Sequence, residues 1–306
     1  MRVSFVVRAR PQAGPPTGIR VERVDGAGED LLLEGAARVT AVPEDADVVL
    51  VCVRFEQVDE ALAAVLRGTQ APVVPMTPIF PDQFAFLEGV LGPGRLFPGM
   101  PGVVAYRAGD EETYRYWLPR MATTLIEQPV PEQPVPVIDA LARALDASGI
   151  QSRVQRGVHA TNLATTFTFV PVMMGIDVAG SIDALLTDDK TLDLVLRAAD
   201  EARLLAHVYG KPALWAEWFV RFASRPLFGA LTPKGMVAHS LRLGVAFARR
   251  RSPEGVQYVE EHFGHKLRTQ NLLMAEKMVD LFREHGRAHP AMTDLRDRLR
   301  AALSVA

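Results

Sequence analysis

A continuous apolar run near the start of the chain constrains the fold more than any other feature. Residues 48–53 read VVLVCV, without a polar interruption. A strand of this kind is covered on both faces, as in a parallel sheet. Residues 57–67 follow at once, with the apolar spacing of an amphipathic helix. A buried strand that leads directly into such a helix predicts an α/β fold.

The rest of the first half repeats this alternation. Two segments that flank a glycine-containing turn, 19–24 and 30–33, predict a hairpin. The chain opens on MRVSFVVRAR, a short apolar strand that runs into Arg8 and Arg10. Further strands are predicted at 72–75, 103–106, 123–126 and 151–155, and further helices at 82–91 and 137–148.

Strand signals stop near residue 156. The segments with helical spacing beyond it are 159–175, 181–208, 212–223, 236–249, 255–285 and 290–303. We therefore predict a Rossmann-like α/β domain over residues 1–155, incomplete at its N-terminus, followed by an all-helical domain over residues 156–306. This is the layout of many two-domain dehydrogenases, in which the ligand lies in the cleft between the domains.

Composition restricts the class of protein. The formal net charge of −2 gives no electrostatic support to a general role on nucleic acid or on an anionic membrane. The single cysteine, Cys52, excludes an internal disulfide. No apolar stretch is expected to approach the roughly 20 uncharged residues of a membrane helix. The N-terminus is not a signal peptide, because Arg8 and Arg10 close its apolar run, and a cytoplasmic protein is the default expectation.

Three segments in this order carry a family resemblance. They are the strand that ends at Arg8, the sequence ADVVLVCVRFEQVDEAL at residues 46–62, and the helical region that ends in HGRAHPAM at residues 285–292. Together they resemble the ketopantoate reductase family, the 2-dehydropantoate 2-reductases. The resemblance implies a Rossmann domain joined to a helical substrate and dimerisation domain. It also implies NADP-dependent reduction of a small 2-keto acid and, commonly, a homodimer.

The resemblance places two arginines at the cofactor. Arg8 matches the arginine that binds the 2′-phosphate of NADP, and a guanidinium suits a phosphate because it can bind in a bidentate manner. Arg54 matches a lysine that follows the next strand, at the carboxyl edge of the sheet. Without the resemblance, Arg8 is equally well a solvated arginine at a strand end, and Arg54 a weak surface ion pair with Glu56.

The positions that match the family's catalytic residues are substituted. Asn162 stands at the lysine, nine residues before Pro171, and the two family asparagines fall on Thr166 and Val170. Asparagine cannot supply the ammonium that would protonate a developing alkoxide. Thr166 can still donate a hydrogen bond, and His159, one turn away, is a candidate proton donor, although a residue that only starts the helix is the more common case.

Two further family features are replaced. The family's serine and glutamate fall near Glu260 and Leu272. The asparagine-glycine loop expected after residues 72–75 reads Met76-Thr77-Pro78-Ile79-Phe80-Pro81. Proline removes backbone donors that such a loop could offer.

The glycine-rich phosphate loop of the family has no counterpart in the sequence. Residues 25–28 (DGAG) follow the arginine strand instead of preceding it and read as a turn. In the usual strand order 3-2-1-4-5-6 the missing first strand is central. We therefore expect that the natural protein starts about 25–30 residues upstream of Met1, roughly the strand, loop and helix of one βαβ unit.

Two functions remain open from the sequence. The first is an NADP-dependent oxidoreductase with a small carbonyl substrate. The second is an inactive relative kept as a binding or structural protein, which the substituted lysine and loop favour. Three other patterns have simpler interpretations. We interpret Glu261, His262 and His265 as a solvated helix face instead of a metal site. We interpret Trp215, Trp218 and Phe222 as core or subunit packing, and Arg249, Arg250 and Arg251 as the C-terminal end of a helix.

Overall fold

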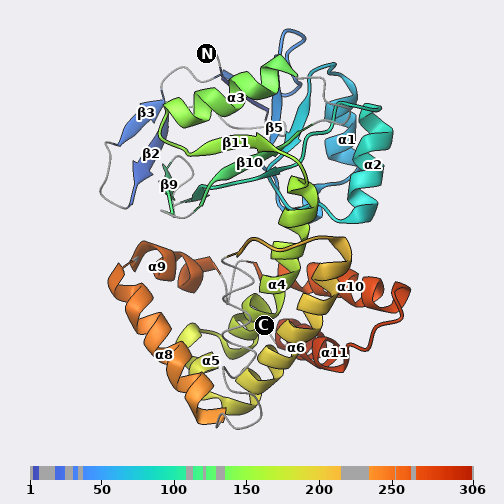
Figure 1. The fold of residues 1–306 in the computed structure, drawn as a ribbon. Coiled ribbons are helices and arrows are strands. Elements are labelled where there is room, and N and C mark those ends of the chain that lie inside the picture. The colour runs from blue at the N-terminus through green and yellow to red at the C-terminus, as the bar shows by residue number, and fades with distance from the viewer. Residues whose placement is uncertain are drawn as a thin grey trace. The chain divides into compact units, whose positions relative to one another are not determined.

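The chain forms two compact units, Met1–His159 and Ala160–Ala306, each with its own core (Figure 1). The computed structural model describes residues 3–6, 18–24, 30–33, 37–107, 113–119, 122–128, 135–214, 234–251, 253–262 and 267–304. Several residues considered above lie outside the described residues: Arg8, the turn at 25–28, the aromatic residues Trp215, Trp218 and Phe222, and His265.

The first unit alternates strands and helices. In chain order its elements are β1 (Ser4–Val6), β2 (Ile19–Arg23), β3 (Leu31–Leu33), β4 (Ala37–Val39), β5 (Val49–Val51), η1 (Phe55–Gln57), α1 (Glu60–Arg67), β6 (Val73–Pro75), α2 (Pro81–Leu91), β7 (Gly99–Met100), β8 (Val104–Arg107), β9 (Thr113–Trp117), β10 (Thr124–Glu127), α3 (Pro136–Ala147) and β11 (Ser152–Gln155).

The strands pair in four groups. β1 pairs with β4, and β5 with β6, in both cases parallel. A third sheet has the order β11-β10-β7, with β10 parallel to β11 and antiparallel to β7. The fourth has the order β3-β2-β9-β8, in which β2 and β3 form the predicted hairpin and β2 runs parallel to β9. The parallel pairs confirm the α/β prediction for this half of the chain.

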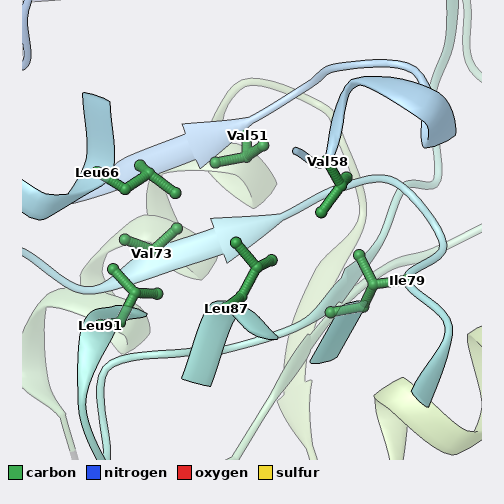
Figure 2. Packing of buried hydrophobic residues seen from close by; sticks show 7 residues of the cluster. All are labelled: Val51, Val58, Leu66, Val73, Ile79, Leu87 and Leu91. Atoms are coloured by element: carbon green, nitrogen blue, oxygen red, sulfur yellow. The ribbon is translucent and has the colours of Figure 1, made fainter. Parts of the chain in front are cut away.

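The β5–β6 pair is covered by α1 and α2. Its seven core side chains point toward one another in Figure 2 and come from both strands, both helices and the turns between them: Val51, Val58, Leu66, Val73, Ile79, Leu87 and Leu91. Asp59 begins α1 by accepting a hydrogen bond from the Leu62 amide, and α2 begins at Pro81, where the missing amide hydrogen is no loss. Local sequence signals therefore set both helix starts that follow these strands.

The second unit is helical. It contains α4 (Val158–Ala179), which begins with the last two residues of the first unit, and α5 (Ile182–Thr187), α6 (Asp189–Tyr209), α8 (Lys234–Arg251), α9 (Pro253–His262), α10 (Arg268–Glu284) and α11 (Pro290–Ser304). α11 packs on α6 and α10 and buries Met292, Leu295 and Leu299. The C-terminal end of α8 carries Arg249–Arg251, as predicted, and Arg249 forms an ion pair with Asp183.

Three helix predictions need correction. The helix expected over 181–208 is broken at Asp188, because its carboxylate accepts hydrogen bonds from the amides of Lys190 and Thr191 and starts α6 anew. The helix expected over 255–285 is described as α9 and α10, and residues 263–266 between them lie outside the described residues. The helix expected from residue 57 begins only at Glu60, because η1 ends at Gln57 and residues 58 and 59 are not helical.

The expectation about membrane helices was also wrong as stated. Among the described residues, α4 is long and apolar enough to span a bilayer by length and composition, with a mean hydropathy of 1.3. About two thirds of that stretch, 67%, is buried inside the protein. This burial is typical of a core helix, so its length and composition are weak evidence for a membrane span.

Candidate functional site

The best-formed candidate site lies at the carboxyl edge of the β5–β6 pair, within the first unit. The two strands are parallel, so η1 and the loop of residues 76–80 follow them at the same edge. Ligands bind at this edge in open α/β sheets. The buried side chain of Gln83 joins the two segments, because it accepts a hydrogen bond from the Phe80 amide and donates one to the Phe55 carbonyl, both at 3.0 Å.

Aromatic packing also joins these two segments. The rings of Phe55 and Phe80 meet edge to face with centroids 4.8 Å apart, and both side chains are buried. The amide of Arg54 donates to the side-chain oxygen of Gln57 at 3.0 Å, which closes the turn after β5. Hydrogen bonds and aromatic packing therefore fix the backbone of both segments at this edge, η1 and the loop of residues 76–80.

Arg54 lies at this edge and is paired. Its Nε is 3.1 Å from Oε1 of Glu56, and 56% of the Arg54 side chain is exposed. The other Glu56 oxygen, Oε2, is buried and has no hydrogen-bond partner among the described residues. An exposed pair of this kind contributes little stability. The structure thus places Arg54 where the sequence predicted, and also forms the ion pair that was its alternative interpretation.

His159 packs against the same edge from the first turn of α4. Its ring is stacked on Phe84 of α2, with centroids 4.5 Å apart and planes 18° apart. Its Nε2 donates to the Ile79 carbonyl at 3.0 Å. Burial is the main cause that lowers the pKa of His159 from its usual value, against smaller opposing effects of the Ile79 hydrogen bond and the Glu127 charge.

Glu127 fixes the start of α4. It is the last residue of β10, and its two carboxylate oxygens accept hydrogen bonds from the amides of Gly157 at 2.7 Å and His159 at 2.8 Å. A carboxylate on the free amides of a helix N-terminus is favourable both as a hydrogen-bond acceptor and as a charge. Sequence reasoning missed this residue, because it lies 32 positions before the amide that it binds.

The substituted catalytic positions lie on α4 in the second unit. Asn162 is buried, and Thr166, one turn on, is half-buried. The hydroxyl of the neighbouring Thr165 donates to the Thr161 carbonyl at 2.6 Å and accepts from the Ala213 amide at 2.8 Å. Val170 is fully buried, and its aliphatic side chain has no hydrogen-bonding group.

The family's serine and glutamate positions fall on two further helices of this unit. Glu260 belongs to α9 and Leu272 to α10, and Leu272 is half-buried. Beside Leu272, Asn271 is fully buried and its Nδ2 donates to Oδ2 of the buried Asp177 at 2.7 Å. This polar pair in the helical core was not predicted, because one asparagine and one aspartate on separate helices carry no sequence signal.

Nothing in the described part of the chain forms a metal centre. No group of three or more His, Cys, Asp or Glu side chains among the described residues could hold a metal ion. Of the residues considered for a metal site, Glu261 and His262 end α9, and His265 lies outside the described residues.

Comparison with solved structures defines the class of fold. The chain shares the fold of 2-dehydropantoate 2-reductase from Geobacter metallireducens GS-15, with a TM-score of 0.68 and 15% identity over 98% of this chain and 91% of that one. The predicted Rossmann-like domain followed by a helical domain is confirmed.

Two other similar structures extend the comparison. A D-mandelate dehydrogenase with NADH and anilino(oxo)acetate matches 93% of this chain and 84% of its own, with a TM-score of 0.59 and 12% identity. A dimeric ketopantoate reductase from Staphylococcus aureus matches 93% of this chain and 86% of its own, with a TM-score of 0.59 and 11% identity. Neither a protein-family model nor a curated protein sequence matches the chain.

Proposed function

We propose that the protein is a nicotinamide-dependent oxidoreductase that interconverts a small 2-keto acid, or a related carbonyl compound, and its 2-hydroxy form. The observation that carries the proposal is a ketopantoate reductase fold with a basic side chain, Arg54, at the carboxyl edge of the β5–β6 pair. The D-mandelate dehydrogenase of the same fold binds NADH and anilino(oxo)acetate. The test is turnover of reduced nicotinamide by the full chain with a panel of 2-keto acids.

The proposed cofactor is NADP, which Arg8 and Arg54 would bind. Arg8 follows the apolar segment that opens the sequence, and a guanidinium there would hold the 2′-phosphate that distinguishes NADP from NAD. Arg8→Ala should weaken NADPH binding about tenfold or more and leave NADH binding unchanged. Arg10→Ala is the matched control, and equal losses of NADPH and NADH binding in Arg8→Ala would contradict this assignment.

The two domains then have different proposed roles. Residues 1–155 would bind the cofactor, and residues 156–306 would supply the substrate contacts and a homodimer interface. The dimeric ketopantoate reductase of the same fold supports the second assignment. Sedimentation equilibrium of the full chain should give twice the mass of one chain, whereas a monomer at all concentrations would oppose it.

Cofactor binding by this fold needs a phosphate loop, and we propose that a further strand, loop and helix complete the first unit. In the described residues β1 is hydrogen-bonded to β4 alone and β5 to β6 alone. In a doubly wound sheet one strand lies between two such pairs. Apolar side chains on these strands are exposed, 39% for Val6 on β1 and 41% for Leu50 on β5, and a covering element would bury them.

The intact mass of the native protein tests this extension. We expect a mass that exceeds that of residues 1–306 by about 25–30 residues, the size of the missing part of a βαβ unit. A native mass that matches residues 1–306 would refute the extension and would leave the cofactor without its phosphate loop.

An inactive relative is the second candidate function. Two observations favour it: Asn162 is buried where the family has a lysine, and the loop of residues 76–80 contains Pro78 and has no asparagine or glycine. This candidate predicts no hydride transfer with any 2-keto acid, even where the cofactor binds. Measurable turnover with one substrate of the panel excludes it.

A further inference from the structure

The imidazole of His159 has one nitrogen in use and one available. A carbonyl oxygen can only accept a hydrogen bond, so the 3.0 Å contact with Ile79 requires a proton on Nε2. In the part of the chain that the structure describes, no group is hydrogen-bonded to Nδ1. The neutral ring therefore presents a lone pair at Nδ1, because the bond made by one nitrogen sets the state of the other.

The ring cannot easily turn away from this orientation. Phe84 is stacked against one of its faces, and the backbone amide of His159 is held by Glu127. A proton-transfer group that is already oriented loses little entropy in the reaction. His159 as a whole is partly exposed.

We propose that His159 is a catalytic residue, whose Nδ1 exchanges the hydroxyl proton of the substrate at the carboxyl edge of the β5–β6 pair. The inference rests on the oxidoreductase function proposed above. When a 2-hydroxy acid is oxidised, its C–H bond breaks and the hydride, with both electrons, passes to the oxidised nicotinamide. The O–H bond breaks as the C=O bond forms, and the proton goes to Nδ1.

The reverse reaction runs through the same atoms. Reduced nicotinamide gives a hydride to the keto carbon, and the imidazolium gives the Nδ1 proton to the oxygen. Water then returns the proton to the ring. His159 would thus exchange the substrate proton in place of the ammonium group that Asn162 cannot provide.

The surroundings of His159 set the pH dependence. Of the elements packed against the ring, β10 brings the Glu127 carboxylate, α2 the uncharged ring of Phe84, and the loop of residues 76–80 the Ile79 carbonyl. Burial outweighs the Glu127 charge and the Ile79 bond, so the pKa of His159 lies below its usual value. The ring is then mainly a proton acceptor at neutral pH.

The two reaction directions should therefore depend on pH in opposite ways. Oxidation needs the neutral ring, so its kcat/KM should rise with pH to a plateau, and the inflection should lie at the pKa of His159, below the ordinary histidine value. Reduction needs the imidazolium, so its kcat/KM should fall as the pH rises through the same pKa.

His159→Gln separates the chemical role from the structural one. The glutamine amide can still donate to the Ile79 carbonyl, but it cannot exchange a proton near neutral pH. We expect kcat/KM to fall by about 100-fold or more and the inflection attributed to His159 to vanish. The melting temperature should fall by at most a few degrees, because glutamine keeps the Ile79 hydrogen bond and loses only the stacking on Phe84. His207→Gln, the same substitution at an exposed position on α6, should leave the activity and the pH profile unchanged.

A second measurement does not depend on turnover. In ¹⁵N-resolved spectra of the full chain without cofactor, the resonance lost in His159→Gln should show the Nε2–H form and titrate below the usual histidine pKa. The Nδ1–H form at neutral pH would overturn the inference. If His159→Gln turns over the cofactor with an unchanged rate and pH profile, the inference about His159 fails and the proposed function stands. If the wild-type protein shows no turnover with any substrate, the proposed function fails as well.

Discussion

Replacement of Glu127 by glutamine should destabilise the first unit by about 1–2 kcal/mol. The carboxylate accepts two hydrogen bonds at the start of α4, from the amides of Gly157 and His159. An amide keeps one acceptor oxygen, which should stay with the half-buried His159 amide, while water can reach exposed Gly157. The variant then loses the charge-assisted hydrogen bond from the Gly157 amide, which contributes about 1.5–3 kcal/mol, and hydration of that amide offsets part of this loss. It also loses the favourable interaction of the carboxylate charge with the helix dipole, about 0.3–1 kcal/mol.

Chemical denaturation of the full chain measures this loss. The midpoint for Glu127→Gln should fall at an unchanged slope, and hydrogen exchange of the Gly157 and His159 amides should become faster. Glu88→Gln is the matched control, since Glu88 is exposed on α2 and should change the free energy of unfolding by less than about 0.5 kcal/mol. If Glu127→Gln behaves like this control, the carboxylate does not hold the helix and the reasoning fails.

Three other substitutions test the packing and hydrogen bonding inside each unit. Glu201→Gln should lower the stability of the second unit by about 1–2 kcal/mol, because Glu201 accepts hydrogen bonds from two successive amides at the start of α11, at 3.1 and 2.8 Å; the urea midpoint measures it. Gly102→Ala should lower stability by about 1–3 kcal/mol, because a Cβ would lie 2.4 Å from the Thr124 backbone nitrogen. Gly89→Ala, with open space around it in α2, should instead stabilise by about 0.5–1 kcal/mol, and equal effects of the two alanines would contradict this account.

The elements that could be predicted from the sequence carry local signals. The apolar run at 48–53 and the proline that begins α2 each specify their structure within a few residues, and the strand and helix lie where these signals placed them. The hairpin of β2 and β3 was also correctly predicted, from two apolar segments around a glycine turn. Periodicity and turn chemistry act over short distances, so one sequence is sufficient to recognise them.

Long-range pairing could not be predicted in this way. β9 was missed, although it pairs with β2 and with β8, because its place in the sheet depends on a strand some 90 residues earlier. The Glu22–Arg115 contact across that pairing spans 93 positions and has no sequence signature. The break at Asp188 was missed for a different reason, since an aspartate inside an apolar periodicity can equally be a solvated helix residue.

The same limit applies to the site. Arg54 and His159 could be singled out because residue type and position after a strand or at a helix start suggest chemistry. Their partners could not be foreseen in the same way. Glu127 and Gln83 act through backbone groups that lie 32 and 28 positions away, so only the folded unit shows that they position the site.

These contacts also imply that Glu127 and His159 do not act independently. Glu127 holds the His159 amide, and the His159 side chain holds the loop of residues 76–80 through Ile79, so both contacts fix the first turn of α4. Once Glu127→Gln has loosened that turn, the ring contact with Ile79 is already weakened. His159→Ala, which removes the ring contact, should therefore cost less in the Glu127→Gln background than in the wild type, with a coupling of about 0.5–1 kcal/mol. Strict additivity would mean that the carboxylate and the ring stabilise separate features, and that the position of the His159 ring does not depend on the cap.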